Sequence, residues 1–152
     1  MSPSVIIAAD GRPTFDISAG EDLGQVATNA IRMLRGELSG KHRIDWARPA
    51  APAGRLVIES PTLAAADDQS FRLRTERDGG GWRLIVTGSG ERGILYGLCE
   101  VLDRLESRDG ALWLPDLNLN SSPTMKKRGT GRHWSPRFSD DEGVEANLQL
   151  IR

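Results

Sequence analysis

Three short strands are predicted from compact apolar runs. Val5–Ala9 (VIIAA) is continuously apolar and ends at Asp10-Gly11, a pair typical of turns. Such a run is typical of a strand that is covered on both faces. Arg55–Glu59 (RLVIE) predicts a second strand, and Leu112–Leu114 predicts a last one near the end of the patterned region.

A hairpin is predicted by residues that alternate between apolar and polar. The alternation runs from Phe71 to Glu76 and again from Trp82 to Thr87, on either side of the turn Asp78–Gly81. A period of two on both sides of a glycine-rich turn indicates two antiparallel strands with one buried face.

Two segments, Glu21–Leu38 and Glu91–Glu106, have apolar residues spaced by three and four positions. This spacing predicts two amphipathic helices, the first of which is expected to stop at Gly40. In the second helix, Gly93 and Gly97 lie about one turn apart, and Tyr96 stands between them. We expect these glycines to let the helix lie very close to the sheet.

The predicted elements follow the order β-α-β-β-β-α-β. This order indicates an α/β (α+β) domain over residues 1–120, in which one mixed sheet has two helices packed on one of its faces.

Residues 121–152 have a different character, polar at first and then patterned like a helix. Ser139–Glu142 (SDDE) is a capping box, and an apolar stripe follows at Val144, Leu148 and Ile151. We expect a linker followed by the start of a second structural unit. A helix this short is marginal alone, so we expect it to be disordered, to fold back, or to pair with a second copy in a dimer.

The composition narrows the function classes. The 20 basic and 21 acidic residues nearly cancel, which argues against nucleic acid or an anionic membrane as partner. No apolar run is long enough to span a membrane, and no signal peptide is visible, so a cytoplasmic location is expected if Met1 is the native start.

Residues that could carry chemistry are few. Cys99 is the single cysteine and is interpreted as a small apolar residue of a helix. His42 and His133 have no ligand-type neighbours at metal-binding spacing, and the pairs Asp67-Asp68 and Asp140-Asp141 are interpreted as loop or cap residues. The sequence therefore predicts no catalytic residue, no metal and no cofactor.

One motif offers an alternative. Gly88–Gly93 (GSGERG) matches G-x-G-x-x-G after a predicted strand and before a predicted helix, and Asp116 follows 23 positions later. A small nucleotide-binding module is the alternative that this motif supports. A tight turn between strand and helix is the simpler interpretation, because the preceding strand belongs to an antiparallel hairpin.

The segment from Phe71 to Leu105 resembles the second half of the small domain that precedes the catalytic barrel in β-N-acetylhexosaminidases of glycoside hydrolase family 20. Related modules precede the barrels of family 84 hexosaminidases and family 67 α-glucuronidases. The similarity consists of an apolar hairpin followed by G-x-x-Y-G-x-x-x-L-x-x-L in the helix. Here that pattern is occupied by Gly93, Tyr96, Gly97, Val101, Leu102 and Leu105.

The resemblance implies a non-catalytic domain that packs against a (β/α)₈ barrel, with residues 121–152 as linker and first part of that barrel. The parent protein would be a glycoside hydrolase whose catalytic carboxylates lie outside this chain. Arg128, in the pair Arg128-Gly129, is the position that the resemblance assigns to sugar binding. The sugar and the linkage stay open.

Carbohydrate is a further candidate partner. Trp46, Trp113 and Trp134 could serve as stacking platforms for sugar rings in a carbohydrate-binding module. The other interpretation is that they pack beneath loops.

Overall fold

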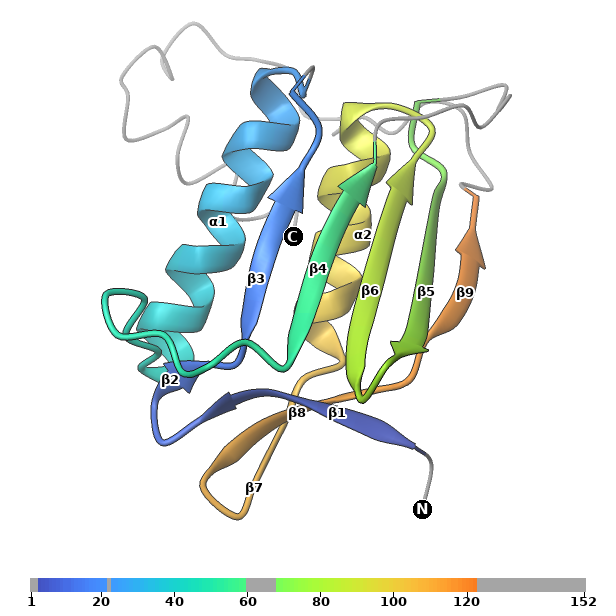
Figure 1. Ribbon diagram of the computed structural model, residues 1–152. Coiled ribbons are helices and arrows are strands. Elements are labelled where there is room, and N and C mark those ends of the chain that lie inside the picture. Colours follow the sequence, from blue (N-terminus) through green and yellow to red (C-terminus); the bar gives the residue numbers. More distant parts are fainter. Residues whose placement is uncertain (1–2, 22, 60–67, 123–152) are drawn as a thin grey trace, which may run out of the picture.

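The computed structural model describes residues 3–21, 23–59 and 68–122, apart from the side chain of residue 78. Figure 1 shows these residues as two helices and two sheets. The predicted α/β class is therefore correct, but the single mixed sheet is not.

The larger sheet has five strands in the order β3-β4-β6-β5-β9. Strands β3, β4 and β6 are mutually parallel, whereas β5 is antiparallel to β6 and to β9. The bounds of its strands are β3 Phe15–Ala19, β4 Gly54–Glu59, β5 Phe71–Asp78, β6 Gly81–Gly88 and β9 Asn118–Ser121.

The smaller sheet is antiparallel and has the order β2-β1-β8-β7. Its strands are β1 Ser4–Ala9, β2 Arg12–Pro13, β7 Glu106–Arg108 and β8 Ala111–Pro115. The first and last predicted strands thus lie here and not in the larger sheet. Both hairpins turn at an Asp-Gly pair with positive φ, Asp10-Gly11 and Asp109-Gly110, as tight hairpin turns require.

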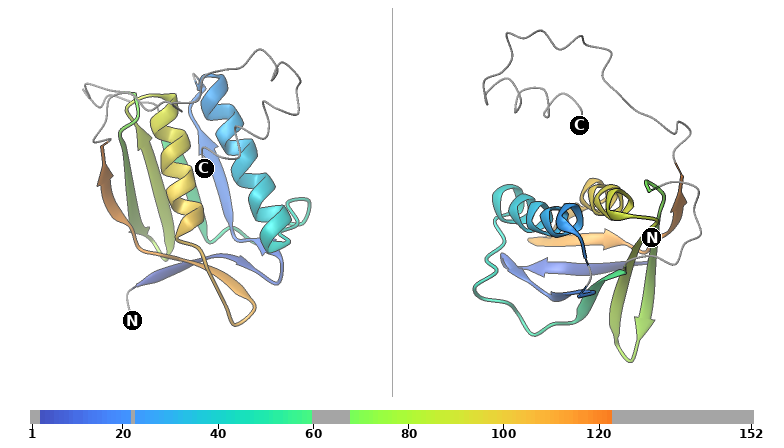
Figure 2. Two further views of the ribbon diagram at one scale, coloured as in Figure 1. Left: turned by 180° about the vertical axis from the view of Figure 1, so that it is seen from behind. Right: turned by 90° about the horizontal axis from the view of Figure 1, so that it is seen from above.

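Both helices, α1 (Gln25–His42) and α2 (Glu91–Asp103), cover the same face of the five-stranded sheet, as predicted (Figure 2). Helix α1 begins and ends four residues later than expected. Gly40 does not stop it, and the helix ends where Arg43 adopts the left-handed conformation and donates its N–H to the Leu38 carbonyl. Helix α2 ends before Glu106, because that residue begins β7.

The core lies between the helices and the five-stranded sheet and continues to the inner face of the smaller sheet. The alternation predicted for the hairpin is confirmed, since Leu73, Leu84 and Val86 are buried while Arg72 and Arg83 are exposed. In β1, Val5, Ile7 and Ala8 are buried whereas Ile6 is half-buried, so the strand is not covered on both faces along its whole length.

Candidate functional site

The glycine-rich turn between β6 and α2 is packed against its own chain. Residues 68–70 run across it, with the N–H of Ser89 donating to the Ser70 carbonyl (2.8 Å) and the N–H of Gly93 donating to the Asp68 carbonyl (2.9 Å). A Cβ added at Gly93 would overlap the Ser70 carbonyl oxygen, and one at Gly90 would lie 3.0 Å from the Asp68 Cβ. The glycines thus make room for residues 68–70. A phosphate cradle would instead need backbone N–H groups that are open to a ligand.

The N-terminus of helix α1, which meets the first residue of α2 beside this turn, is also occupied. The carboxylate of Glu91, the first residue of α2, accepts hydrogen bonds from the N–H groups of Val26 (2.6 Å) and Ala27 (3.3 Å) at the start of α1. The cap residue Gly24 has no side chain of its own, and a Cβ there would overlap the Glu91 carboxylate. Glu91 therefore caps α1 from a neighbouring helix, which joins the two helices at this end.

Asp116, the acid that the nucleotide-binding alternative requires, is engaged elsewhere. Its carboxylate forms an ion pair with Arg77 at 2.9 Å, and the backbone N–H of Asp116 donates to the Pro3 carbonyl. Together with the packed turn, this arrangement favours the simpler interpretation of GSGERG as a tight turn between strand and helix.

Gly97 and Tyr96 lie on α2 above the hairpin. A Cβ at Gly97 would lie 3.0 Å from Val86 Cγ1 and 3.5 Å from Leu73 Cδ2, so the helix backbone is close to the sheet here. Tyr96 is half-buried and packs against the core. Their expected role as packing residues, like that of Gly93, stays a prediction for mutagenesis.

Two of the three candidate stacking tryptophans are described, and both are partly covered. Trp46 meets Phe15 edge-on at 5.6 Å between ring centroids, and the Arg35 guanidinium lies 5.3 Å from its ring. Arg108 lies 4.4 Å from the Trp113 ring. Trp134, Arg128 and His133, like the capping box at Ser139–Glu142, lie outside the described residues.

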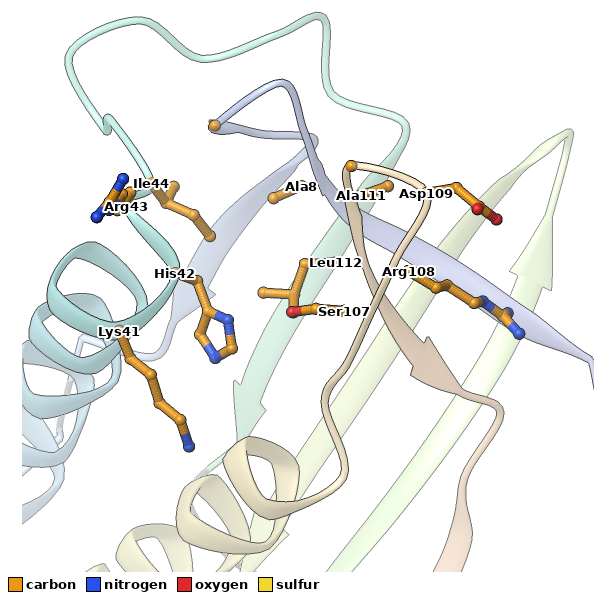
Figure 3. Close-up of a pocket in the computed structure, with 12 residues that line it drawn as sticks. Ala8, Lys41, His42, Arg43, Ile44, Ser107, Arg108, Asp109, Ala111 and Leu112 are labelled. Carbon is orange, nitrogen blue, oxygen red and sulfur yellow. The ribbon is translucent and has the colours of Figure 1, made fainter.

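A cavity of about 400 Å³ opens at the opposite end of the molecule from the glycine-rich turn. It lies between the last turn of α1 and the β7–β8 hairpin, with Lys41 and His42 on one side and Ser107 and Leu112 on the other (Figure 3). Burial, and secondarily the charge of Lys41, lowers the pKa of His42. The sequence reasoning missed this cavity, although Asp109-Gly110 is a recognisable hairpin signal.

A second cavity of about 230 Å³ lies between α2 and the end of β9. It is lined by aromatic, hydroxyl and carboxylate side chains, among them Phe71, Tyr96, Glu100 and Ser122. The Glu100 carboxylate pairs with Arg104 at 2.6 Å, one helical turn away.

Among residues 3–21, 23–59 and 68–122, no group of three or more His, Cys, Asp or Glu side chains is placed to hold a metal ion. Neither helix in that part of the chain is long and apolar enough to cross a membrane.

No family model matches the sequence, and no curated protein matches it. Solved structures do match. A chitobiase from Flavobacterium johnsoniae, named FjGH20, superposes with a TM-score of 0.70 over 99% of this chain at 14% identity. This fold occurs within glycoside hydrolases. The GH84 protein CpGH84B matches over 99% of the chain (TM-score 0.54, 14% identity), and a GH138 enzyme that targets pectin rhamnogalacturonan II matches over 90% (TM-score 0.58, 17% identity).

These matches confirm, for the fold, the resemblance that residues 71–105 suggested. The chain spans 24% of the chitobiase, 25% of CpGH84B and 17% of the GH138 enzyme. It therefore corresponds to one part of each larger enzyme.

Proposed function

We propose that this chain is a non-catalytic accessory domain of a glycoside hydrolase, that residues 1–120 form the domain, and that it packs against a catalytic (β/α)₈ barrel. The observation that carries the proposal is the structural match, which takes in 99% of this chain but only 24% of the chitobiase. In the parent enzyme, paired carboxylates of the barrel would hydrolyse the glycosidic bond.

Three carboxylates of the described residues form ion pairs with arginines, which supports a non-catalytic role for these three acids. Glycoside hydrolysis needs two carboxyl groups that flank the scissile bond across an open site. Here Glu76 pairs with Arg74 and Arg83 on the sheet surface, at 2.9 and 3.0 Å. Asp116 and Glu100 are likewise engaged by arginines, so these acids stabilise the domain surface.

The outer side of α2 is the surface that we propose contacts the barrel. Of its outward residues only Arg92 and Asp103 are fully exposed, whereas Leu95, Cys99 and Leu102 are half-buried and apolar. The open face of the five-stranded sheet is unsuited to such a contact because it is rich in charge. Its outward residues include Arg55, Arg72, Arg74, Glu76 and Arg83. Obligate interfaces are apolar at their centre, and Leu95, Cys99 and Leu102 would supply the apolar part of this contact. Arg92 and Asp103 would lie beside it.

An activity assay tests the first half of the proposal. The chain is incubated with chromogenic N-acetylglucosaminide, glucuronide and glucoside substrates, and no turnover is expected. Turnover that is lost when an internal Asp or Glu is replaced would contradict the non-catalytic role.

A binding experiment tests the second half. The catalytic segment that the proposal expects in the same gene is produced separately and titrated calorimetrically with this chain. Leu102→Glu should abolish binding, because it places a charge in the apolar contact, whereas the matched control Asn29→Glu on the exposed side of α1 should bind like wild type. Both variants are first checked for an unchanged melting temperature. Equal binding by Leu102→Glu would show that α2 is not the contact surface.

A further inference from the structure

The cavity at the end of α1 combines an apolar floor with basic side chains. Ala8, Ile44 and Leu112 line it and are buried, so they form a surface against which carbon atoms can pack. Lys41 and His42 extend from the last turn of α1 into the gap facing β7, and Ser107 lies opposite them (Figure 3). A volume of about 400 Å³ is within the usual range of small-molecule sites.

The residues that line the cavity carry more positive than negative charge. Lys41 and Arg43 have no ion-pair partner among the described residues. Arg108 points away, with its guanidinium over the Trp113 ring and a hydrogen bond to Ser4 Oγ (2.8 Å). Asp109, the acid among the lining residues, also points away from His42, on the far side of the hairpin (Figure 3). Basic residues in the last turn of a helix are common because they complement the helix dipole. That preference explains the charges, but it does not explain the cavity beside them.

We propose that this cavity is a binding site for a small organic anion, a carboxylate or a phosphate ester, held by Lys41 and His42 with the Ser107 hydroxyl as a further hydrogen-bond donor. The charged group would lie beside Lys41, where charge-assisted hydrogen bonds are strongest. The carbon skeleton would pack on Ile44 and Leu112. No residue of α2 is among those that line the cavity.

Binding should depend on pH through His42. Its pKa is lowered by burial first and by Lys41 second, and the other charged lining residues are Arg43, Arg108 and Asp109. Histidine is the side chain whose ordinary pKa lies within the physiological range. An anion favours the imidazolium, so binding should tighten as the pH is lowered through the pKa of His42.

The test is a titration of the ¹⁵N-labelled chain with glucuronate, with glucose 6-phosphate and with glucose, at constant ionic strength in chloride. We expect saturable shifts in the amides of residues 41–44 and 107–112 with at least one of the two anions and none with neutral glucose. Which anion binds distinguishes a carboxylate from a phosphate ligand.

Variants identify the residues responsible. Lys41→Gln should weaken binding about ten-fold, as expected for one lost charge-assisted bond, and His42→Gln should remove the pH dependence. Arg32→Gln is the matched control, because it removes a cation from the same helix outside the cavity, and it should bind like wild type. The proposal is overturned if no anion saturates these amides at millimolar concentrations, if glucose binds equally well, or if Arg32→Gln weakens binding as much as Lys41→Gln.

Discussion

The two helices cover the same face of the same sheet, but their outer surfaces differ. Helix α1 exposes polar residues such as Asn29 and Arg32, and also the apolar Val26. In α2, Leu95 and Leu102 are half-buried at the surface. A helix on the free surface of a domain has a polar outer face, and a helix within an assembly does not need one. This contrast supports the proposed contact between α2 and a larger unit, in which α1 would face solvent.

The glycines of the two helices also differ, in how closely other parts of the chain approach them. A Cβ at Gly36 or Gly40 of α1 would meet nothing within 4 Å, whereas one at Gly93 or Gly97 of α2 would contact the sheet or the loop beside it. Glycine in a helix interior costs about 0.5–1 kcal/mol relative to alanine. In α2 that cost is offset by close packing, and in α1 nothing in the structure offsets it.

The largest expected effect is that of Gly93→Ala. The new Cβ would overlap the Ser70 carbonyl oxygen, which is backbone and cannot turn aside. We expect the free energy of unfolding to fall by about 3 kcal/mol, the upper range for overpacking, as measured by urea denaturation. The matched control is Gly36→Ala in α1, which should stabilise the domain by about 0.5–1 kcal/mol. Equal effects of the two substitutions would show that the glycines of α2 are no more closely packed than those of α1.

Gly97→Val should be less severe. Its Cβ would lie 3.0 Å from a methyl group of Val86, a side chain that can shift by a few tenths of an ångström. We expect a loss of about 1–3 kcal/mol, seen as a fall in melting temperature of about 2–4 °C per kcal/mol. If the variant melts with wild type, α2 does not depend on close approach to the hairpin.

Glu91→Ala tests the connection between the helices. It removes the carboxylate that accepts the Val26 and Ala27 N–H groups, and loss of a helix cap costs about 1 kcal/mol. Hydrogen exchange at those two amides should accelerate. Glu100→Ala is the control, since it removes only the surface pair with Arg104, worth about 0.3–0.5 kcal/mol. A smaller loss for Glu91→Ala than for Glu100→Ala would contradict the capping role.

The smallest effect is the pH dependence contributed by His42. Its pKa is lowered in the folded state by burial and by Lys41, so the unfolded chain takes up a proton at higher pH than the folded chain. Stability is therefore fully retained above the unfolded pKa and decreases as the pH falls from there to the folded pKa. Unfolding by urea in chloride buffer should show the decrease, and His42→Gln should reduce it. An unchanged pH profile in the variant would assign the decrease to other groups.

Local patterns predicted the hairpin and α2 well, because a period of two or of three to four needs only neighbouring residues. The single sheet was wrong, since the partner of β1 is β8, more than 100 residues along the chain (Ser4 pairs with Pro115). Strand β3 was missed because its five residues have too short an alternation to stand out. Such pairings depend on tertiary packing and not on local sequence.

The candidate sites show the same difference between what local patterns predict and what depends on tertiary packing. The motif GSGERG was visible in the sequence, but its role as a tight turn depends on residues 68–70. The sequence pattern could not show that these residues pack across the turn. The cavity joins Lys41 and His42 to Ser107, residues that are distant in the sequence and whose types carry no motif. Arg128, which the resemblance assigns to sugar binding, stays a prediction because it lies outside the described residues.

The most direct test of the proposed contact uses Cys99, the single cysteine of the chain, which lies half-buried on the outer side of α2. The rate of alkylation of its thiol is measured by peptide mass spectrometry in this chain alone and in the chain joined to the catalytic segment that the proposed function requires. Thiol reactivity falls when access is lost, so we expect several-fold slower labelling of Cys99 in the joined protein. A thiol introduced by Thr87→Cys on the open sheet face should label at the same rate in both. Unchanged labelling of Cys99, with protection of the Thr87→Cys thiol instead, would contradict the assignment of α2 as the contact surface.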